Sequence, residues 1–152
     1  MPKALHPIAG ALALLTILTF WTATVLSELL GPATAVVTVK TLIPWGLILL
    51  IPALMVAGGS GFALSKGESA QSIQGAVDAK RKRMPFIAAI GLLVLVPACL
   101  VLAVKARAGA FDVTFYAVQA IELVAGAVNI ALLGLNMRDG LRMTGRLRPR
   151  SA

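Results

Sequence analysis

The most constraining feature of this sequence is that its apolar residues fall into four long blocks. The blocks cover about residues 8–30, 36–64, 84–104 and 113–137, and about 20 apolar residues suffice to cross a bilayer as a helix. A helix also satisfies its own backbone hydrogen bonds in lipid. We therefore expect residues 1–152 to form a single domain, an all-α integral membrane bundle of four antiparallel transmembrane helices.

The composition excludes a soluble domain. Hydrophobic residues make up 59% of the chain and charged residues 13%, against about 25% charged residues in soluble domains. The formal net charge is +8, which in a soluble protein would indicate nucleic acid binding. Because the cations here flank apolar blocks, we expect contact with anionic lipid headgroups and no nucleic acid partner.

The distribution of Lys and Arg predicts an orientation. Eleven of the fourteen lie near the N-terminus, in residues 65–83 or in residues 138–152. The positive-inside rule makes residues 65–83 a basic cytoplasmic loop and residues 138–152 a basic cytoplasmic tail. An even number of spans puts both termini on the same side of the membrane, so both are expected to be cytoplasmic. The arginine bias and small size suit a bacterial plasma (inner) membrane.

Two prolines interrupt the second block. Pro44 and Pro52 each remove a backbone hydrogen-bond donor and crowd the preceding turn. The second helix is therefore predicted to be kinked.

The fourth block separates into faces when it is written as a helix. The polar face contains Asp112, Tyr116, Gln119, Glu122, Gly126, Asn129 and Asn136. A second, small-residue face contains Ala117, Ala120, Ala127, Ala131 and Gly134. Small residues permit close helix contact, whereas amides and a carboxyl group are costly in hydrocarbon, so the polar face should point into the bundle.

Glu122 is the most informative residue on the polar face. It lies three residues from the midpoint of the 113–137 block, about 4–5 Å along a helix axis. Hydrocarbon favours a neutral carboxyl group unless a cation or several donors stabilise the ionised form. Lys40 is a candidate cation, and Gln119 and Asn129 are candidate donors.

These residues support two interpretations. In the first, Glu122, Gln119, Asn129, Asn136 and Tyr116 form an intramembrane site that binds a ligand or a proton. In the second, a neutral Glu122 joins the asparagines in holding the helices together.

Three predictions concern the outer ends of the spans. Glu28 and Lys40 flank the turn at 31–34 and are expected to form a surface ion pair of little energetic consequence, or to act as charges at an outer mouth. Asp112 is expected to be the N-cap of the fourth helix. An interfacial aromatic belt is predicted at Trp45, Phe111, Phe115 and Tyr116.

The sequence offers little for cofactor or enzyme chemistry. His6 is the single histidine and would need a second axial ligand to hold haem b, which leaves haem open but unsupported. Cys99 is the single cysteine, so no Cys/His metal site is expected. The chain has no P-loop, nucleotide-binding glycine motif or H-E-x-x-H motif, so an enzyme is not favoured.

We therefore expect a small membrane protein that binds or translocates a small solute, ion or proton. Two alternatives stay open at this point. One is a structural or accessory subunit of a larger membrane complex, or a homodimer joined through small-residue faces. The other is a redox protein that holds haem b or quinone.

Overall fold

The computed structural model describes the backbone of residues 5–65 and 74–143, and the side chains of residues 7–59 and 82–142. Within these ranges the chain is helical and contains no strands. The helices are α1 (Leu5–Leu30), α2 (Ala33–Ser65), α3 (Gln74–Ala89), the π-helix η1 (Ile90–Leu95), α4 (Val96–Arg107) and α5 (Val113–Met143). Helices α3, η1 and α4 follow one another without a break.

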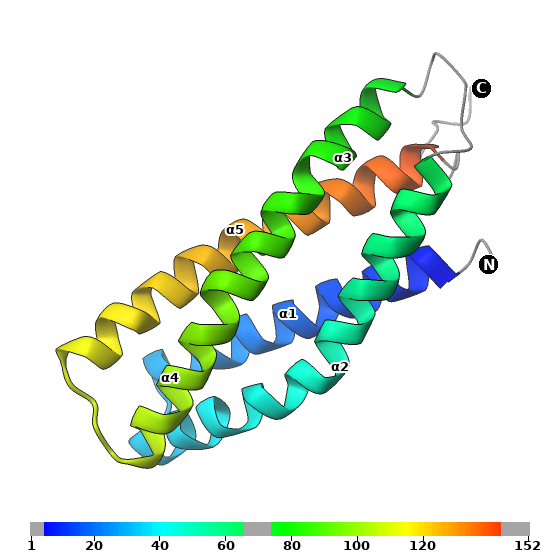
Figure 1. Ribbon diagram of the computed structural model, residues 1–152. Coiled ribbons are helices and arrows are strands. Elements are labelled where there is room, and N and C mark those ends of the chain that lie inside the picture. The colour runs from blue at the N-terminus through cyan, green and yellow to red at the C-terminus, as the bar shows by residue number, and fades with distance from the viewer. Residues whose placement is uncertain (1–4, 66–73, 144–152) are drawn as a thin grey trace, which may run out of the picture.

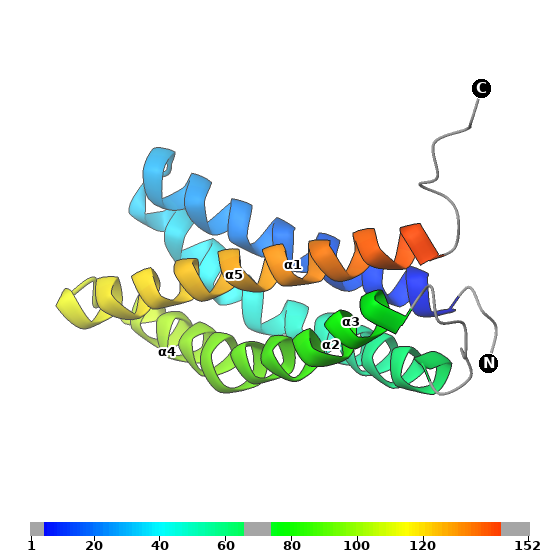
Figure 2. The same ribbon diagram turned by 90° about the horizontal axis from the view of Figure 1, so that it is seen from above.

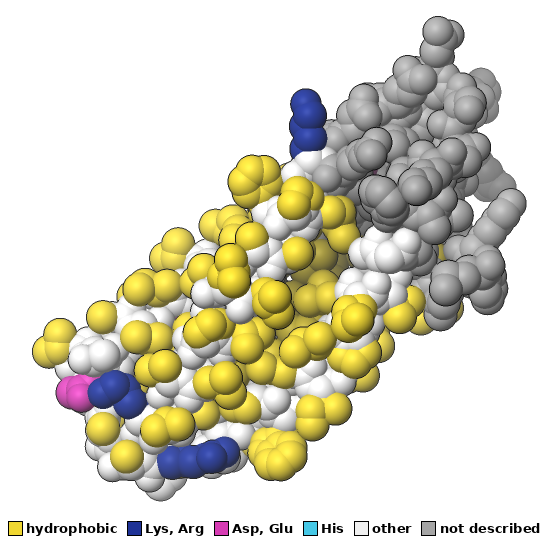
Figure 3. All heavy atoms as spheres, in the orientation of Figure 1, with side chains coloured by type: hydrophobic (Ala, Val, Ile, Leu, Met, Phe, Trp, Pro, Cys, Tyr) yellow, Lys and Arg dark blue, Asp and Glu magenta, His cyan; other side chains and the backbone are white. Residues whose placement is uncertain are grey.

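Four helical segments are long and apolar enough to cross a membrane. They are Pro7–Leu30, Ala33–Gly59, Lys82–Arg107 and Val113–Arg142. For the described residues, the prediction of an all-α protein with four such helices is confirmed. On the face seen in Figure 3, hydrophobic side chains cover most of the described surface, and the charged side chains lie toward its ends.

The four spans form a bundle in which sequential spans run in opposite directions (Figures 1 and 2). The turns at residues 31–32 and 108–112 lie at one end, here called the turn end. The opposite end is here called the terminal end. It contains the start of α1, the end of α2, the start of α3 and the end of α5. Helix α1 packs against α2 and α5, and α4 also packs against α2 and α5. Within their described residues, α2 and α5 make no close backbone approach, so they occupy opposite corners.

The two turns use residues suited to them. A Cβ atom on Gly31 would lie 2.7 Å from the Ser27 carbonyl oxygen, so a side chain would not fit where α1 ends. Gly109 has φ +65, a conformation that glycine adopts without steric cost. The Phe115 N–H donates to Asp112 Oδ1 at 2.9 Å, which confirms Asp112 as the N-cap of α5.

The prolines of the spans lie in two different settings. Helix α2 continues through Pro44 and Pro52. In the third span the helix widens into η1 directly before Pro97, and the Val96 N–H bonds back to the Gly91 carbonyl oxygen. The wider turn brings η1 against α5.

Two aromatic side chains of α1 pack against glycines. A Cβ atom on Gly46 of α2 would lie 2.1 Å from the Phe20 ring, and one on Gly126 of α5 would lie 2.9 Å from the Trp21 ring. Since any larger side chain would displace these rings, the two glycines allow α1 to pack closely against α2 and α5.

Two apolar clusters form the core, one on each side of the bundle centre. The first, toward the turn end, contains Val36, Leu102, Ala106 and Phe115. The second, toward the terminal end, contains Ala13, Ile17, Leu50, Ala53, Ile87 and Leu133. Lys40, Gln119, Glu122 and Asn129 lie between the two clusters along their helices.

Several details differ from the sequence predictions. Helix α3 begins at Gln74, so the second half of the predicted 65–83 loop is helical, and residues 66–73 lie outside the described part. Helix α5 extends to Met143, so the predicted tail at 138–152 starts as helix, and residues 144–152 are not described. Phe115 is fully buried and cannot belong to an aromatic belt, whereas Trp45 and Tyr116 are exposed.

Candidate functional site

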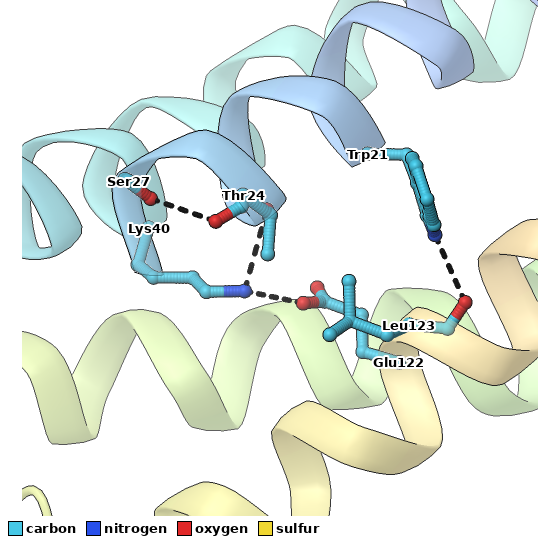
Figure 4. A network of polar contacts seen from close by, with 6 residues as sticks. All are labelled: Trp21, Thr24, Ser27, Lys40, Glu122 and Leu123. Carbon is cyan, nitrogen blue, oxygen red and sulfur yellow. Dashed lines mark hydrogen bonds and ion pairs between the residues drawn. The ribbon is translucent and has the colours of Figure 1, made fainter. Parts of the chain in front are cut away.

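The interior of the bundle contains an ion pair between Lys40 of α2 and Glu122 of α5. The Lys40 Nζ atom contacts Glu122 Oε2, and it lies 3.5 Å from the Thr24 hydroxyl of α1 (Figure 4). The exposed fractions of the two side chains are 1% for Lys40 and 12% for Glu122. Because α2 and α5 are at opposite corners, this pair crosses the interior of the bundle.

The pair lies well inside the helices and nearer to the turn end. Glu122 is nine residues after Val113, about 13 Å along the axis of α5. Lys40 is seven residues after Ala33, about 10 Å along the axis of α2. The four-carbon stem of Lys40 then carries its ammonium group toward the bundle axis.

The sequence prediction of a Glu28–Lys40 surface pair is wrong. Lys40 is buried, and its described partners are Glu122 and Thr24. Removing two charges from water costs several kcal/mol for each ion, so the geometry of this pair has large energetic consequences. A surface pair would have contributed about 0–1 kcal/mol.

Glu28 lies one helical turn beyond Thr24, toward the turn end of α1. The side chain is only partly exposed, and its Oε1 atom is buried with no hydrogen-bond partner among the described residues. Ser27 beside it donates to the Thr24 carbonyl oxygen at 3.0 Å. The outer-mouth residues predicted from the sequence are therefore at different depths, with Lys40 inside the bundle and Glu28 nearer to its end.

The amide side chains of α5 are buried along the same face. Asn129 is 0% exposed and Gln119 is buried, and neither amide group has a hydrogen-bond partner in the described residues. The Asn136 Nδ2 donates to Met84 Sδ at 3.3 Å. Tyr116 is 54% exposed and lies outside this group.

Gln119, Glu122, Asn129 and Asn136 therefore turn inward together, as the sequence predicted for the polar face. The small-residue face of α5 lies outward. Its four alanines are exposed.

A cavity of about 60 Å³ adjoins the ion pair. Its polar lining includes Thr24, Cys99 and Glu122, and most of the remaining lining is aliphatic or aromatic. A cavity needs roughly 10–15 Å³ to hold a water molecule, so this one has room for water. Trp21 also lines it and donates its Nε1–H to the Leu123 carbonyl oxygen at 2.9 Å (Figure 4).

Two other ion pairs join α5 to its neighbours. At the turn end, Lys105 contacts Asp112 at 2.7 Å. The hydrogen bond from Lys105, followed by the one from the Phe115 N–H, lowers the pKa of the Asp112 carboxyl group. Toward the terminal end, Arg83 of α3 contacts Asp139 at 2.7 Å.

The structure adds little on cofactors. The His6 side chain, the one candidate haem ligand, lies outside the described residues. Within the described part of the chain, no three His, Cys, Asp or Glu side chains come close enough together to hold a metal ion.

Three features of the site were missed by sequence reasoning. They are the contact of Thr24 with Lys40, the Trp21 hydrogen bond and the Arg83–Asp139 pair. A signal for the first two was present, because Trp21, Thr24 and Glu28 are spaced three and four residues apart and share one face of a helix. The pairing of Arg83 with Asp139 depends on how α3 packs against α5, which no local spacing specifies.

Compared with known proteins, the chain matches no family model, no curated protein and no solved structure. Its class therefore rests on its own features. Four helices long and apolar enough to cross a membrane, with an ion pair enclosed between them, define an integral membrane protein.

Proposed function

We propose that this chain is a small multi-pass membrane protein that binds or translocates a small solute, ion or proton at the Lys40–Glu122 pair. The observation that carries the proposal is the enclosed ion pair beside a cavity. Ionisable groups inside a membrane are expensive and are typically retained for binding, proton transfer or transport.

The orientation is proposed from the positive-inside rule. The basic residues of 65–83 and 138–152 put the terminal end in the cytoplasm of a bacterial plasma membrane, against anionic headgroups. Glu28 and Gln119 then lie on the outer side of the ion pair, and Asn129 and Asn136 on its cytoplasmic side.

The residues along α5 supply a polar route for a ligand. Gln119, Glu122, Asn129 and Asn136 are spaced along its inward face, at intervals of about 4–11 Å. Helix α2 is proposed as the moving element, kinked at Pro44 and Pro52, because a proline weakens the backbone hydrogen bonding of a helix. Its Lys40 side chain would couple that motion to Glu122.

The experiment is flux through the purified chain in phospholipid vesicles. One set of vesicles contains a pH-sensitive dye and another a sodium-sensitive dye, and a gradient of the corresponding ion is imposed. We expect Glu122→Gln to lower the flux at least tenfold, with Asp112→Asn as the matched control on the same helix. Equal flux in wild type and Glu122→Gln would remove Glu122 from the function.

Cys99 offers an independent test of the cavity. It is the only cysteine, it is buried, and it lines the cavity with Glu122. A small membrane-permeant thiol reagent should block flux in the wild type and leave flux unchanged in Cys99→Ala. Unchanged flux in fully labelled wild type would mean that the cavity is not on the route.

A second candidate function is that of an accessory subunit, in a homodimer or a larger membrane complex. The observation that favours it is the exposure of the small-residue face of α5, whereas the outward faces of the other spans carry large side chains such as Leu15, Ile48 and Leu93. Small residues let a partner helix approach closely. Mass spectrometry of the gently purified protein should then show a stoichiometric partner, and a lone monomer would argue against this role.

A further inference from the structure

We propose that the species exchanged at this site is a proton, and that Glu28, Lys40 and Glu122 hold one such proton in common. This inference rests on the proposed function, because it names the ligand of the same site. It assigns Glu28 to the site as a second carboxyl group beside the ion pair.

The first argument is the charge count of the cluster. Two carboxyl groups and one ammonium group carry a net charge of −1 when all three are ionised. Glu28 lies one helical turn from Thr24, which contacts Lys40. The charge of Glu28 therefore interacts with those of Lys40 and Glu122. An uncompensated buried charge costs several kcal/mol, and one added proton makes the cluster neutral.

The groups around the cluster supply no other neutralising charge. Helix α1 contributes Thr24 and Ser27, α5 contributes Gln119, and α4 contributes the thiol of Cys99 at the cavity wall. On the same side of the bundle, Lys105 and Asp112 neutralise each other at the turn end. Arg107 is exposed, and it lines a groove with Pro44 and Trp45, away from the cavity beside Glu122. In the described residues, Lys40 is therefore the one cation that faces both glutamates.

The hydrogen bonding indicates where the proton resides. Lys40 contacts Glu122, whereas Glu28 Oε1 is buried and has no hydrogen-bond partner in the described residues. A protonated carboxyl group on Glu28 leaves the Lys40–Glu122 ion pair intact and removes the excess charge.

The lining of the cavity favours a very small ligand. Its mostly apolar walls offer few polar groups to replace the hydration of a sugar or an amino acid. Glu122 is already paired with the Lys40 ammonium group, so a metal ion would have to displace that group to bind the carboxylate. A proton needs no additional volume.

The exchange step conserves charge and protons. A proton from the aqueous phase at the turn end binds the Glu28 carboxylate. The proton then moves from Glu28 to Glu122, while the Lys40 ammonium group shifts its contact from Glu122 to Glu28 and keeps all of its own protons. Binding of the aqueous proton takes the cluster from a net charge of −1 to neutral. The transfer from Glu28 to Glu122 leaves it neutral, and the proton has then advanced toward the cavity.

The experiment counts protonated glutamates by infrared spectroscopy of the full chain in lipid vesicles at neutral pH, with ¹³C-labelled glutamate to identify the carboxylic acid band. The chain has three glutamates, Glu28, Glu68 and Glu122. We expect one protonated glutamate in the wild type and none in Glu28→Gln or Glu122→Gln. We expect two in Lys40→Met, because both carboxyl groups must then be neutral. Glu68→Gln is the control and should leave one.

An ion pair that shares no proton gives a different series, with no protonated glutamate in the wild type and in Glu28→Gln. That series would overturn the inference, and the wild-type spectrum decides it even where Lys40→Met does not fold. The flux assay separates this result from the proposed function. If the wild type has no protonated glutamate and Glu122→Gln loses sodium flux, the proton assignment is overturned, but the Lys40–Glu122 pair remains the functional site. If the infrared spectra give the expected series but flux is unchanged in Glu122→Gln, the cluster shares a proton and Glu122 has no role in transport.

Discussion

Two lysine–carboxylate pairs that involve α5 differ mainly in their depth. The Lys40–Glu122 pair joins opposite corners of the bundle, with exposed fractions of 1% and 12%. The Lys105–Asp112 pair joins residues seven apart across a turn, with exposed fractions of 22% and 52%. Water and salt screen the second pair, whereas protein surrounds the first. The same two functional groups therefore form a structural and electrostatic centre at one depth and a weak surface contact at another.

The Arg83–Asp139 pair lies between these extremes. Its arginine is partly exposed and its aspartate is largely buried. Helix α5 is thus paired with α4 at the turn end, with α2 in the middle and with α3 toward the terminal end. This arrangement makes the cost of breaking a pair depend on depth, which three variants can test, one for each pair. A fourth variant tests the packing around the middle pair.

Lys40→Met should have the largest effect. It leaves Glu122 buried without a cation, and breaking a buried pair in this way costs about 3–5 kcal/mol in proteins. We expect that loss in the free energy of unfolding, measured by denaturant titration in micelles with tryptophan fluorescence. The double variant Lys40→Met/Glu122→Leu should recover most of the stability. A double variant as unstable as the single one would show that the pair is not an energetic unit.

Gly126→Ala should have the next largest effect, because the surroundings of the middle pair are tightly packed. The new methyl group would lie 2.9 Å from Trp21 and displace the ring that bonds to Leu123. Overpacking of this kind costs about 1–3 kcal/mol. Gly134→Ala on the same helix is the matched control, since nothing lies within 4 Å of its Cβ position. Equal stability of the two variants would contradict the tight packing of α1 on α5.

Arg83→Met tests the pair of intermediate depth. Asp139 would lose its 2.7 Å partner, but Arg138 at 3.6 Å still offsets part of the charge. We expect a loss of about 1 kcal/mol in the free energy of unfolding. A loss as large as that of Lys40→Met would mean that depth does not order the three pairs.

Much of the architecture was predictable because it depends on local properties of the sequence. Apolar blocks of sufficient length specify four helices, and the polar spacing on α5 places Gln119, Glu122 and Asn129 on one inward face. The N-cap at Asp112 follows from the preference for a short acceptor before a helix.

The partners of these residues were less predictable. Lys40 lies near both Glu28 and the end of a span in the sequence, so a surface pair was the simpler expectation. Its burial follows from α2 and α5 occupying opposite corners with α1 between them, which Gly46 and Gly126 make possible by accepting Phe20 and Trp21. Such glycine contacts depend on the pairing of helices, and no residue pattern within one span reveals them.

Asp112→Asn should have the smallest effect and provides the surface reference for the comparison. Asparagine is also a good N-cap, so the variant loses mainly the charge interaction with Lys105. The pKa of Asp112 is lowered from its ordinary value of 3.8, so its stabilising contribution is complete above that value and disappears as the pH falls through the lowered pKa. The thermal unfolding temperatures of wild type and variant should differ slightly at neutral pH and low salt, and converge in acid or at high salt. A difference that persists in high salt would mean that the turn-end pair is shielded from solvent, and the contrast with Lys40–Glu122 would then need a cause other than depth.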